Sequence, residues 1–228
     1  MHVNDLILEV GRKCNMCCEH CLRGPAENVT MPIETAKFAI DQFDSIGNIT
    51  FTGGEPTLYA KEICEIIDYI LENKKEVYGF YIASNGLIVD TDLMLHLARL
   101  YGYIESIACE NYSQYQLSTD HYHDEVLEEH HILKGFSFVS YRGDINEAAL
   151  INEGNARENG IGHRELDPEM AFSYDEFDTV EMVYVNAKGY LLSDCDYSYQ
   201  TQEEMTPYNI NVLKAGMTLE DVFNTYNK

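Results

Sequence analysis

The chain has 228 residues, of which 39 are acidic and 15 basic, giving a formal net charge of −24. A surface this negative repels phosphate backbones and anionic membranes, and the lysines and arginines are scattered singly, so neither nucleic acid nor a membrane is expected as a partner. The start lacks a signal-peptide pattern, no run approaches the ~18 apolar residues of a membrane span, and the spacing of the seven cysteines does not fit a secreted disulfide framework, so a reducing cytoplasm is expected.

Strands and helices are predicted to alternate along most of the chain. Strands are expected at 6–10, 48–54, 78–86, 103–110 and 134–143. Helices are expected from Thr30 and Pro32 to Phe43, and at 62–71, 90–100, about 124–133 and about 146–159. The first helix places Ile33, Ala36, Ile40 and Phe43 on one face.

This alternation predicts an α/β fold, in which helices cover a parallel sheet. Five or six strand–helix units are too few for a closed eight-stranded barrel, so we expect an open, partial (β/α)6-type TIM-like barrel. Ligands of such folds bind at the carboxyl ends of the strands. The cysteine-rich loop, TGGEP and ASNG each follow a predicted strand, so all three should meet on one face.

The C-terminal segment departs from the strand–helix rhythm. Residues 180–199 predict a hairpin that turns at Asn186–Gly189, and residues 218–227 predict a short closing helix. We expect residues 1–165 to form the barrel core and 166–228 a hairpin-plus-helix extension. No linker rich in Pro, Gly or Ser separates the two, so they are expected to pack as one domain.

The stretch CNMCCEHC (14–21) holds four cysteines in eight positions. They can be grouped as C-x3-C-x2-C (Cys14, Cys18, Cys21) or as two abutting CxxC pairs. Zinc-binding CxxC pairs usually lie on either side of a longer loop, and here the pairs touch, so a four-thiolate zinc site is sterically awkward. A three-thiolate iron–sulfur site is easier, with Cys17 as a bystander. Three ligands would leave one iron open to another molecule.

These residues resemble the signature of the radical S-adenosylmethionine (SAM) enzymes. The likeness combines Cys14, Cys18 and Cys21 with Gly53, Gly54, Glu55 and Pro56, one strand–helix–strand unit downstream. The resemblance implies one 4Fe–4S cluster, SAM bound to the open iron, and reductive cleavage to a 5′-deoxyadenosyl radical that abstracts a hydrogen atom from a substrate. Cluster and cofactor would carry the hard chemistry, while the protein would position them.

The resemblance also implies the SAM contacts. Gly53 and Gly54 would let backbone approach the ligand, and Glu55 would accept from the methionine ammonium. Ser84 and Asn85 would reach the SAM carboxylate or ribose, although an Asn-Gly turn explains them equally well. Ser106 and Glu110, at the end of the strand predicted over 103–110, would contact ribose or substrate.

Other polar residues have weaker functional interpretations. Arg12, Lys13 and Arg23 give the cysteine loop a local positive charge that could offset a cluster or face a reductant, although a plain surface role is favoured. Residues 120–131 hold four histidines without H-E-x-x-H spacing, so a solvated helix is favoured over a second metal site. Candidate substrate contacts are Asp120, His121, Asp194 and Cys195.

The function expected is therefore that of a cytoplasmic radical SAM enzyme with an electron donor such as flavodoxin or ferredoxin. The segment 185–196 resembles the start of the cysteine-rich extension of peptide-modifying members, which favours a peptide or protein substrate. That extension binds auxiliary clusters through several cysteines, and Cys195 alone predicts none here. Alternatives are a glycyl-radical-enzyme activating enzyme, an enzyme acting on a small metabolite, and a non-catalytic zinc or iron–sulfur binding module.

Overall fold

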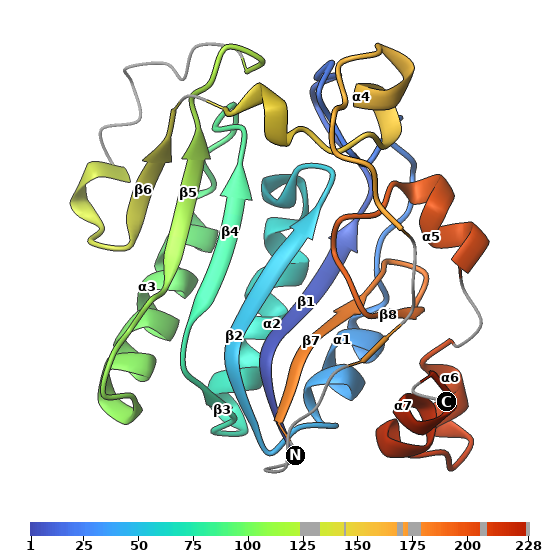
Figure 1. The fold of residues 1–228 in the computed structure, drawn as a ribbon. Helices are drawn as coiled ribbons and strands as arrows, with labels where there is room; N and C mark the ends of the chain where they lie inside the picture. Colours follow the sequence, from blue (N-terminus) through green and yellow to red (C-terminus); the bar gives the residue numbers. More distant parts are fainter. Residues whose placement is uncertain (124–132, 144, 168–170, 173–178, 206–208, 227–228) are drawn as a thin grey trace.

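The computed structural model describes residues 1–228 except 124–132, 144, 168–170, 173–178, 206–208 and 227–228, and is built on one sheet (Figure 1). The strand order is β6-β5-β4-β2-β1-β7-β8, with β3 beside β2. The strands are β1 (His2–Gly11), β2 (Ser45–Gly53), β3 (Glu76–Val77), β4 (Phe80–Ser84), β5 (Gln114–Ser118), β6 (Val139–Arg142), β7 (Thr179–Val185) and β8 (Leu191–Leu192). Neighbouring strands are parallel except β7 and β8. The order ends at β6 and β8 without closing, which confirms the predicted partial barrel.

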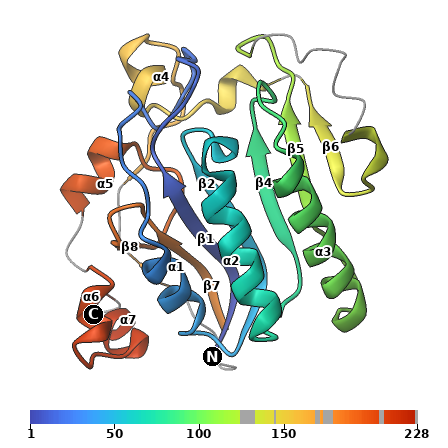
Figure 2. The same cartoon turned by 180° about the vertical axis from the view of Figure 1, so that it is seen from behind.

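Three helices cover one face of this sheet (Figure 2). They are α1 (Ile33–Ile40), α2 (Ala60–Glu72) and α3 (Thr91–Ile107). The other described helices are α4 (Gly154–Glu158), α5 (Tyr199–Met205), α6 (Asn211–Lys214) and α7 (Leu219–Tyr226), with single 3₁₀ turns at Pro56–Tyr59, Leu133–Gly135 and Glu147–Ala149. Within the described residues, no helix combines the length and the apolar character that a membrane crossing needs.

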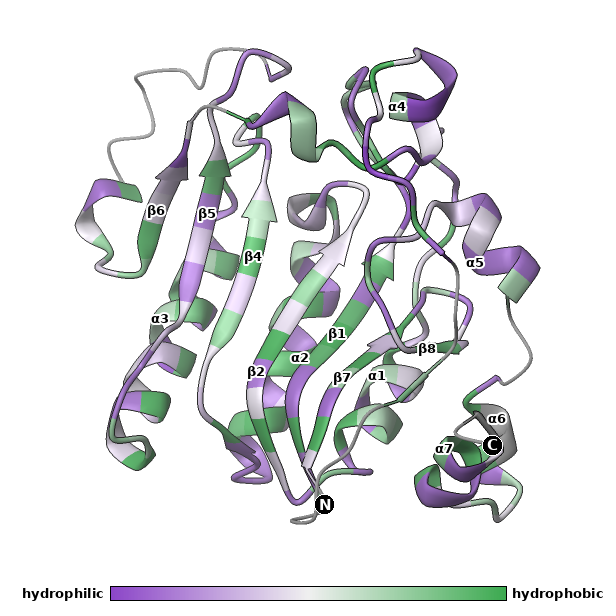
Figure 3. Cartoon of the chain, in the orientation of Figure 1, coloured by the Kyte–Doolittle hydropathy of each residue, from purple (hydrophilic) through white to green (hydrophobic). Residues whose placement is uncertain are grey.

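Successive side chains of a strand point to opposite faces of the sheet, so one strand can contribute to a hydrophobic cluster on each face. In β1, Leu6 and Leu8 belong to the main buried cluster with the residues of these three helices, whereas Ile7 packs with Tyr184 on a second, smaller cluster. Hydrophobic residues run along the central strands β1, β2 and β4 (Figure 3). The parallel strands place all their carboxyl ends at one edge, and the loops of the candidate site leave from there.

One predicted strand is wrong. Residues 103–107 continue helix α3, because Ile104 extends the buried stripe of Leu93, Leu97 and Leu100 at helical spacing. The strand that pairs with β4 is instead β5, in which only Tyr115 and Leu117 are apolar and buried. The prediction took an apolar helix end for a strand and passed over a short, half-polar strand.

Other predicted elements are shorter than expected or lie outside the described residues. The strand predicted over 134–143 is β6, preceded by a 3₁₀ turn, and the helix predicted over 146–159 is a 3₁₀ turn followed by α4. Most of the helix predicted over 124–133 falls on residues that the structure does not describe. The hairpin and the final helix are present as β7–β8 and α7, and the Gly189 amide donates to the Asn186 carbonyl at the predicted turn.

The C-terminal segment contributes to the same sheet as the first half of the chain. Strand β7 pairs in parallel with β1 over six registered positions from His2 to Leu8. An extension that begins at residue 166 therefore supplies a neighbour to the central strand. The division into 1–165 and 166–228 stays a prediction, and packing through β7 supports treating both parts as one unit.

Candidate active site at the carboxyl end of the sheet

The cysteine loop leaves β1 and folds back on itself over residues 12–31. The Arg12 amide donates to the Val29 carbonyl, the Glu27 amide to the Arg12 carbonyl and the Met31 amide to the Val10 carbonyl. Inside the loop, the Cys21 amide donates to the Cys18 carbonyl at 3.2 Å and forms a tight turn. The loop is thus a closed segment anchored on the end of the central strand.

The Gly53–Gly54–Glu55 segment lies directly against the start of this loop. The Gly54 amide donates to the Gly11 carbonyl at 3.0 Å and the Glu55 amide to the Lys13 carbonyl at 2.8 Å. A Cβ on Gly53, whose φ is +149°, would lie 1.9 Å from the Gly11 oxygen, and one on Gly54 would lie 2.2 Å from the Lys13 oxygen. Side chains are excluded at both positions because two stretches of backbone meet there.

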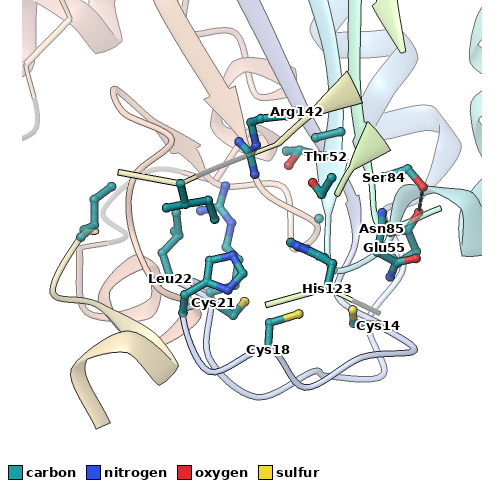
Figure 4. A pocket seen from close by; sticks show the side chains of 18 of the residues that line it. Cys14, Cys18, Cys21, Leu22, Thr52, Glu55, Ser84, Asn85, His123 and Arg142 are labelled. Carbon is teal, nitrogen blue, oxygen red and sulfur yellow. Dashed lines mark hydrogen bonds between the residues drawn. The ribbon is translucent and has the colours of Figure 1, made fainter. Parts of the chain in front are cut away.

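The two segments line one cavity of about 510 Å³. Cys14, Cys18 and Cys21 all line it, whereas Cys17 is exposed and is not among its lining residues. Figure 4 shows the three cysteine side chains on one loop, with Glu55, Ser84 and Asn85 beside Cys14. Cys14, Cys18 and Cys21 thus share this cavity, although all four cysteines line a second, smaller hollow beside it. A donor set of three soft thiolates would suit an iron–sulfur cluster.

Burial favours the protonated thiol at Cys14 and at Cys18. Burial raises the pKa of Cys18 to about 12, with the nearby Cys21, Cys14 and Asp120 raising it further. The pKa of Cys14 is also raised, mainly by burial. Burial together with His123 lowers the pKa of His20 to about 4. A bound metal would have to displace protons from the Cys14 and Cys18 thiols.

Glu55 is buried and held by four donors. Its Oε1 accepts from the Thr57 amide at 3.0 Å, the Thr57 hydroxyl at 2.7 Å and the Ser84 hydroxyl at 2.9 Å, while Oε2 accepts from the Asn85 amide at 2.9 Å. Oε1 is thus saturated and Oε2 keeps acceptor capacity. The carboxylate is fixed in direction, with one oxygen able to bind a cationic group.

Ser84 and Asn85 line the cavity and also hold it together. The Asn85 side-chain amide donates to Asn15 Oδ1 at 2.8 Å, which ties the end of β4 to the cysteine loop. Asn85 Oδ1 accepts from the Leu87 amide at 3.0 Å, an Asx turn. The predicted Asn-Gly turn is therefore present, and the predicted contact of Asn85 with SAM stays a prediction.

Residues from the second half of the chain hold the cysteine loop in place through hydrogen bonds to its backbone carbonyls. Asn155, at the start of α4, donates its side-chain amide to the Cys18 carbonyl at 3.0 Å and its backbone amide to the Cys21 carbonyl at 2.8 Å. Asn159 donates to the Glu19 carbonyl at 3.1 Å, and the Tyr199 amide donates to the Arg23 carbonyl. None of these contacts is predictable from the sequence, because a lone Asn 137 residues away carries no signal there.

Arg12 is wholly buried, so the expectation of a surface role is wrong for it. Its guanidinium pairs with Glu9 at 2.7 Å, Glu203 at 2.9 Å and Glu27 at 3.0 Å, donates to Gln202 and lies over the Tyr199 ring. Burial alone would lower the pKa of Arg12, but the Glu9 carboxylate raises it above the usual value. Arg23 is tied down as well, because it donates to the Tyr197 carbonyl at 2.6 Å.

Some predicted site residues lie away from the cavity. Ser106 is exposed within α3 and donates to the Tyr103 carbonyl, and Glu110 lines a separate hollow at the opposite edge of the sheet, next to Asn4 and Asp5. Both residues were predicted at the site because a strand was wrongly expected over 103–110. Asp194 and Cys195 form a turn after β8, and neither is among the residues lining the cavity.

The cavity is also lined by residues that the sequence did not place in the site, and one of them, His123, belongs to the four-histidine segment for which a solvated helix was favoured. These residues are His20, His123, Arg142, Ile145, Asn146, Ala149, Leu150 and Ile151. Asp120 contacts this part of the cavity lining through His123, whereas His121 is exposed and lies 3.6 Å from Glu147. The position of His20 between Cys18 and Cys21 was a usable signal, since any side chain there must lie near the cysteines.

Comparison with known proteins decides which family this geometry belongs to. Residues 8–137 match the Radical SAM superfamily. This chain is a radical SAM enzyme. Membership of that superfamily implies an iron–sulfur cluster and SAM, and the fit is supported by the three cysteines on one cavity and by the glycine backbone cradle beside them.

Relatives of this radical SAM enzyme align over part of its length. An uncharacterized protein of Methanocaldococcus jannaschii is 42% identical over 92 residues, 39% of this chain and 32% of that protein. An AdoMet-dependent heme synthase of Oleidesulfovibrio alaskensis is 43% identical over 67 residues, 27% of this chain and 17% of that protein. The alignments thus span a third or less of these relatives.

Two solved structures share the fold. One is anSMEcpe with bound AdoMet and the Cp18Cys peptide, at a TM-score of 0.58 and 15% identity, covering 98% of this chain and 80% of that one. The other is Streptococcus suis SuiB bound to the precursor peptide SuiA, at a TM-score of 0.51 and 12% identity, covering 96% of this chain and 64% of that one.

Proposed function

We propose that this chain holds a single 4Fe–4S cluster on Cys14, Cys18 and Cys21 and uses it to cleave SAM reductively. One observation carries the proposal: three of the four crowded cysteines line a common cavity against the Gly53–Gly54 backbone, while Cys17 is exposed outside it. Three thiolates leave one iron able to bind an outside ligand. When bound, the reduced cluster supplies the electron that splits SAM, and the 5′-deoxyadenosyl radical then abstracts a hydrogen atom from the substrate.

The protein's part in this reaction is to bind, orient and shield. The free lone pairs of Glu55 Oε2 would accept from the SAM ammonium, while Ser84 and Asn85 keep that carboxylate in place. Gly53, Gly54 and Pro56 line the same wall and would let the methionine part lie against backbone. An electron donor such as flavodoxin or ferredoxin would reduce the cluster.

For the substrate we propose a peptide or protein. The support is the fold shared with anSMEcpe and SuiB, whose structures contain peptides, together with the hairpin segment that resembles the start of the extension in peptide-modifying members. Cys195 alone follows β8 in this segment, so we propose no auxiliary cluster. A glycyl-radical activating enzyme and a small-metabolite enzyme are the competing assignments within the family.

Anaerobic reconstitution followed by iron analysis and a SAM cleavage assay tests the cluster proposal. We expect about four irons per chain and dithionite-dependent release of 5′-deoxyadenosine. Cys18→Ala should abolish that release, whereas the matched control Cys17→Ala, one position away and exposed, should leave most of it.

Two outcomes would contradict this proposal. Equal loss in Cys17→Ala and Cys18→Ala would show that the cysteines are grouped differently. One equivalent of zinc with no SAM cleavage would instead identify a non-catalytic binding module. Incubation with candidate peptides and mass spectrometry of the products would test the substrate class.

A further inference from the structure

Three metal-ligating side chains lie close together at the cavity, which His20 and His123 line, while Asp120 is buried behind His123. His20 comes from the cysteine loop, between Cys18 and Cys21, while Asp120 and His123 come from the turn that follows β5. One ligand atom from each side chain lies within 4.8 Å of the other two. Two loops that are far apart in the sequence thus place two imidazoles and a carboxylate around one point.

Two atoms of this group are buried and lack a hydrogen-bond partner in the described structure. They are Nδ1 of His20 and Oδ2 of Asp120. The Asp120 side chain is fully buried, and that of His123 is 10% exposed. A buried polar atom without a partner costs about 1–3 kcal/mol, and more when it carries charge. Neither atom satisfies the other, so both are available to a further group bound between them.

A structural role explains only one of the two carboxylate oxygens of Asp120. Its Oδ1 accepts from the Tyr122 amide at 3.1 Å and lies 2.8 Å from His123 Nδ1, the contacts of an ordinary Asx turn. Oδ2 takes no part in this turn. Arg142 lines the same cavity, yet it forms no ion pair with Asp120 in the described residues. A cation bound to Oδ2 would satisfy it.

We propose that His20, Asp120 and His123 bind one divalent first-row transition-metal ion, separate from the thiolate site. Two imidazoles and a carboxylate are ligands that suit Fe(II), Mn(II), Co(II) or Zn(II), and three protein ligands leave open positions. The Tyr122 amide, which donates to Oδ1, would hold the carboxylate in its orientation. The open positions are available to a carboxylate or carbonyl oxygen of a molecule in the cavity.

The first test uses Co(II) and removes the competing thiolates. In full-length Cys14→Ala/Cys18→Ala/Cys21→Ala protein, Co(II) titration should give one bound equivalent, with visible d–d absorption and no sulfur charge-transfer band. Adding His123→Ala or Asp120→Asn should weaken binding at least tenfold. His121→Ala is the matched control, since His121 is an exposed neighbour outside the triad, and it should leave the titration unchanged.

The second test uses the reconstituted protein with its cysteines intact, and it decides the question if circular dichroism shows the triple variant to be unfolded. Mn(II) is titrated in, and binding is measured as the loss of the electron paramagnetic resonance signal of free Mn(II). We expect one binding site, which should be absent in Asp120→Asn. No bound Co(II) or Mn(II), or equal weakening by His121→Ala, would overturn the proposal. Both readouts are independent of SAM cleavage, so this metal site and the proposed function can fail separately.

Discussion

At the scale of single residues, the close contact of Gly54 with Lys13 makes the sharpest prediction. Gly54→Ala would place a methyl group 2.2 Å from a backbone oxygen that the Glu55 amide also uses. Backbone cannot yield as a flexible side chain can, so the cysteine loop must shift at a cost of about 1–3 kcal/mol. We expect iron loading after reconstitution to fall at least twofold, measured as iron and sulfide per chain.

Gly102→Ala is the matched control for this substitution. Gly102 lies within α3, and a Cβ there meets no atom within 4 Å. Alanine in a helix interior should stabilise the protein by about 0.5–1 kcal/mol and leave iron loading unchanged. Normal loading in Gly54→Ala would show that the loop tolerates displacement and that the backbone contact does not position the cluster.

Residue identity singled out the cysteines and the GGEP residues that line the cavity, but it did not place His20, Arg142 or the 145–151 stretch there. The cysteine spacing and the GGEP motif are local patterns, and the parallel sheet brings them together by topology alone. His20, Asp120 and His123 come together only because β5 lies beside β4, and the sequence pattern places that strand wrongly. Because one strand was assigned to the wrong residues, the cavity residue His123 that follows it was misplaced in the prediction.

At the scale of elements, helix α5 closes a buried polar network under the cysteine loop. Gln202 is wholly buried, and its side chain contacts Arg12, Glu9 and Asn186. Glu9 also accepts from the Tyr184 hydroxyl and from the Ala187 amide. This network joins β1, β7 and α5, and it explains how the C-terminal segment can hold a loop that begins at residue 12.

Gln202→Leu should destabilise the fold substantially. The leucine fills a similar volume but leaves charged Arg12 and Glu9 each with a lost partner in a buried site, at a cost of about 2–4 kcal/mol. Urea unfolding of the cluster-free protein, followed by circular dichroism, measures the change. The same substitution at Gln200, whose exposed side chain contacts Glu204 on the same helix, should change stability by less than about 0.5 kcal/mol. Similar losses at both positions would show that helix propensity, and not the network, sets the effect.

Apolar periodicity predicted the elements whose buried positions are regularly spaced. It failed where the same residues suit both a helix and a strand. Helix α2 and strands β1 and β2 are predictable because their apolar positions repeat cleanly. Helix α3 was predicted too short because its C-terminal turns are rich in aromatic and branched residues, which also suit strands. Arg12 was assigned to the surface because nothing in sequence pairs it with Glu203, 191 positions away.

At the scale of the whole molecule, the charge of −24 should make stability depend on salt in a defined direction. Surface ion pairs such as Lys37–Glu65 and Arg99–Asp68 are exposed and worth little, whereas the excess carboxylates repel one another across the entire surface. Salt screens both the attraction and the repulsion. The repulsion outweighs the attraction because acidic residues outnumber basic ones by 24.

Raising NaCl from about 10 mM to about 150 mM shortens the screening length from roughly 30 Å to roughly 8 Å. If this relieves about 1 kcal/mol of repulsion, the thermal midpoint should rise by about 2–4 °C. Differential scanning calorimetry of the cluster-free protein checks this, with KCl in parallel to exclude a specific effect of sodium. A midpoint that falls with salt would mean that the surface ion pairs outweigh the repulsion. The charged surface would then act as a network of ion pairs that stabilises the fold.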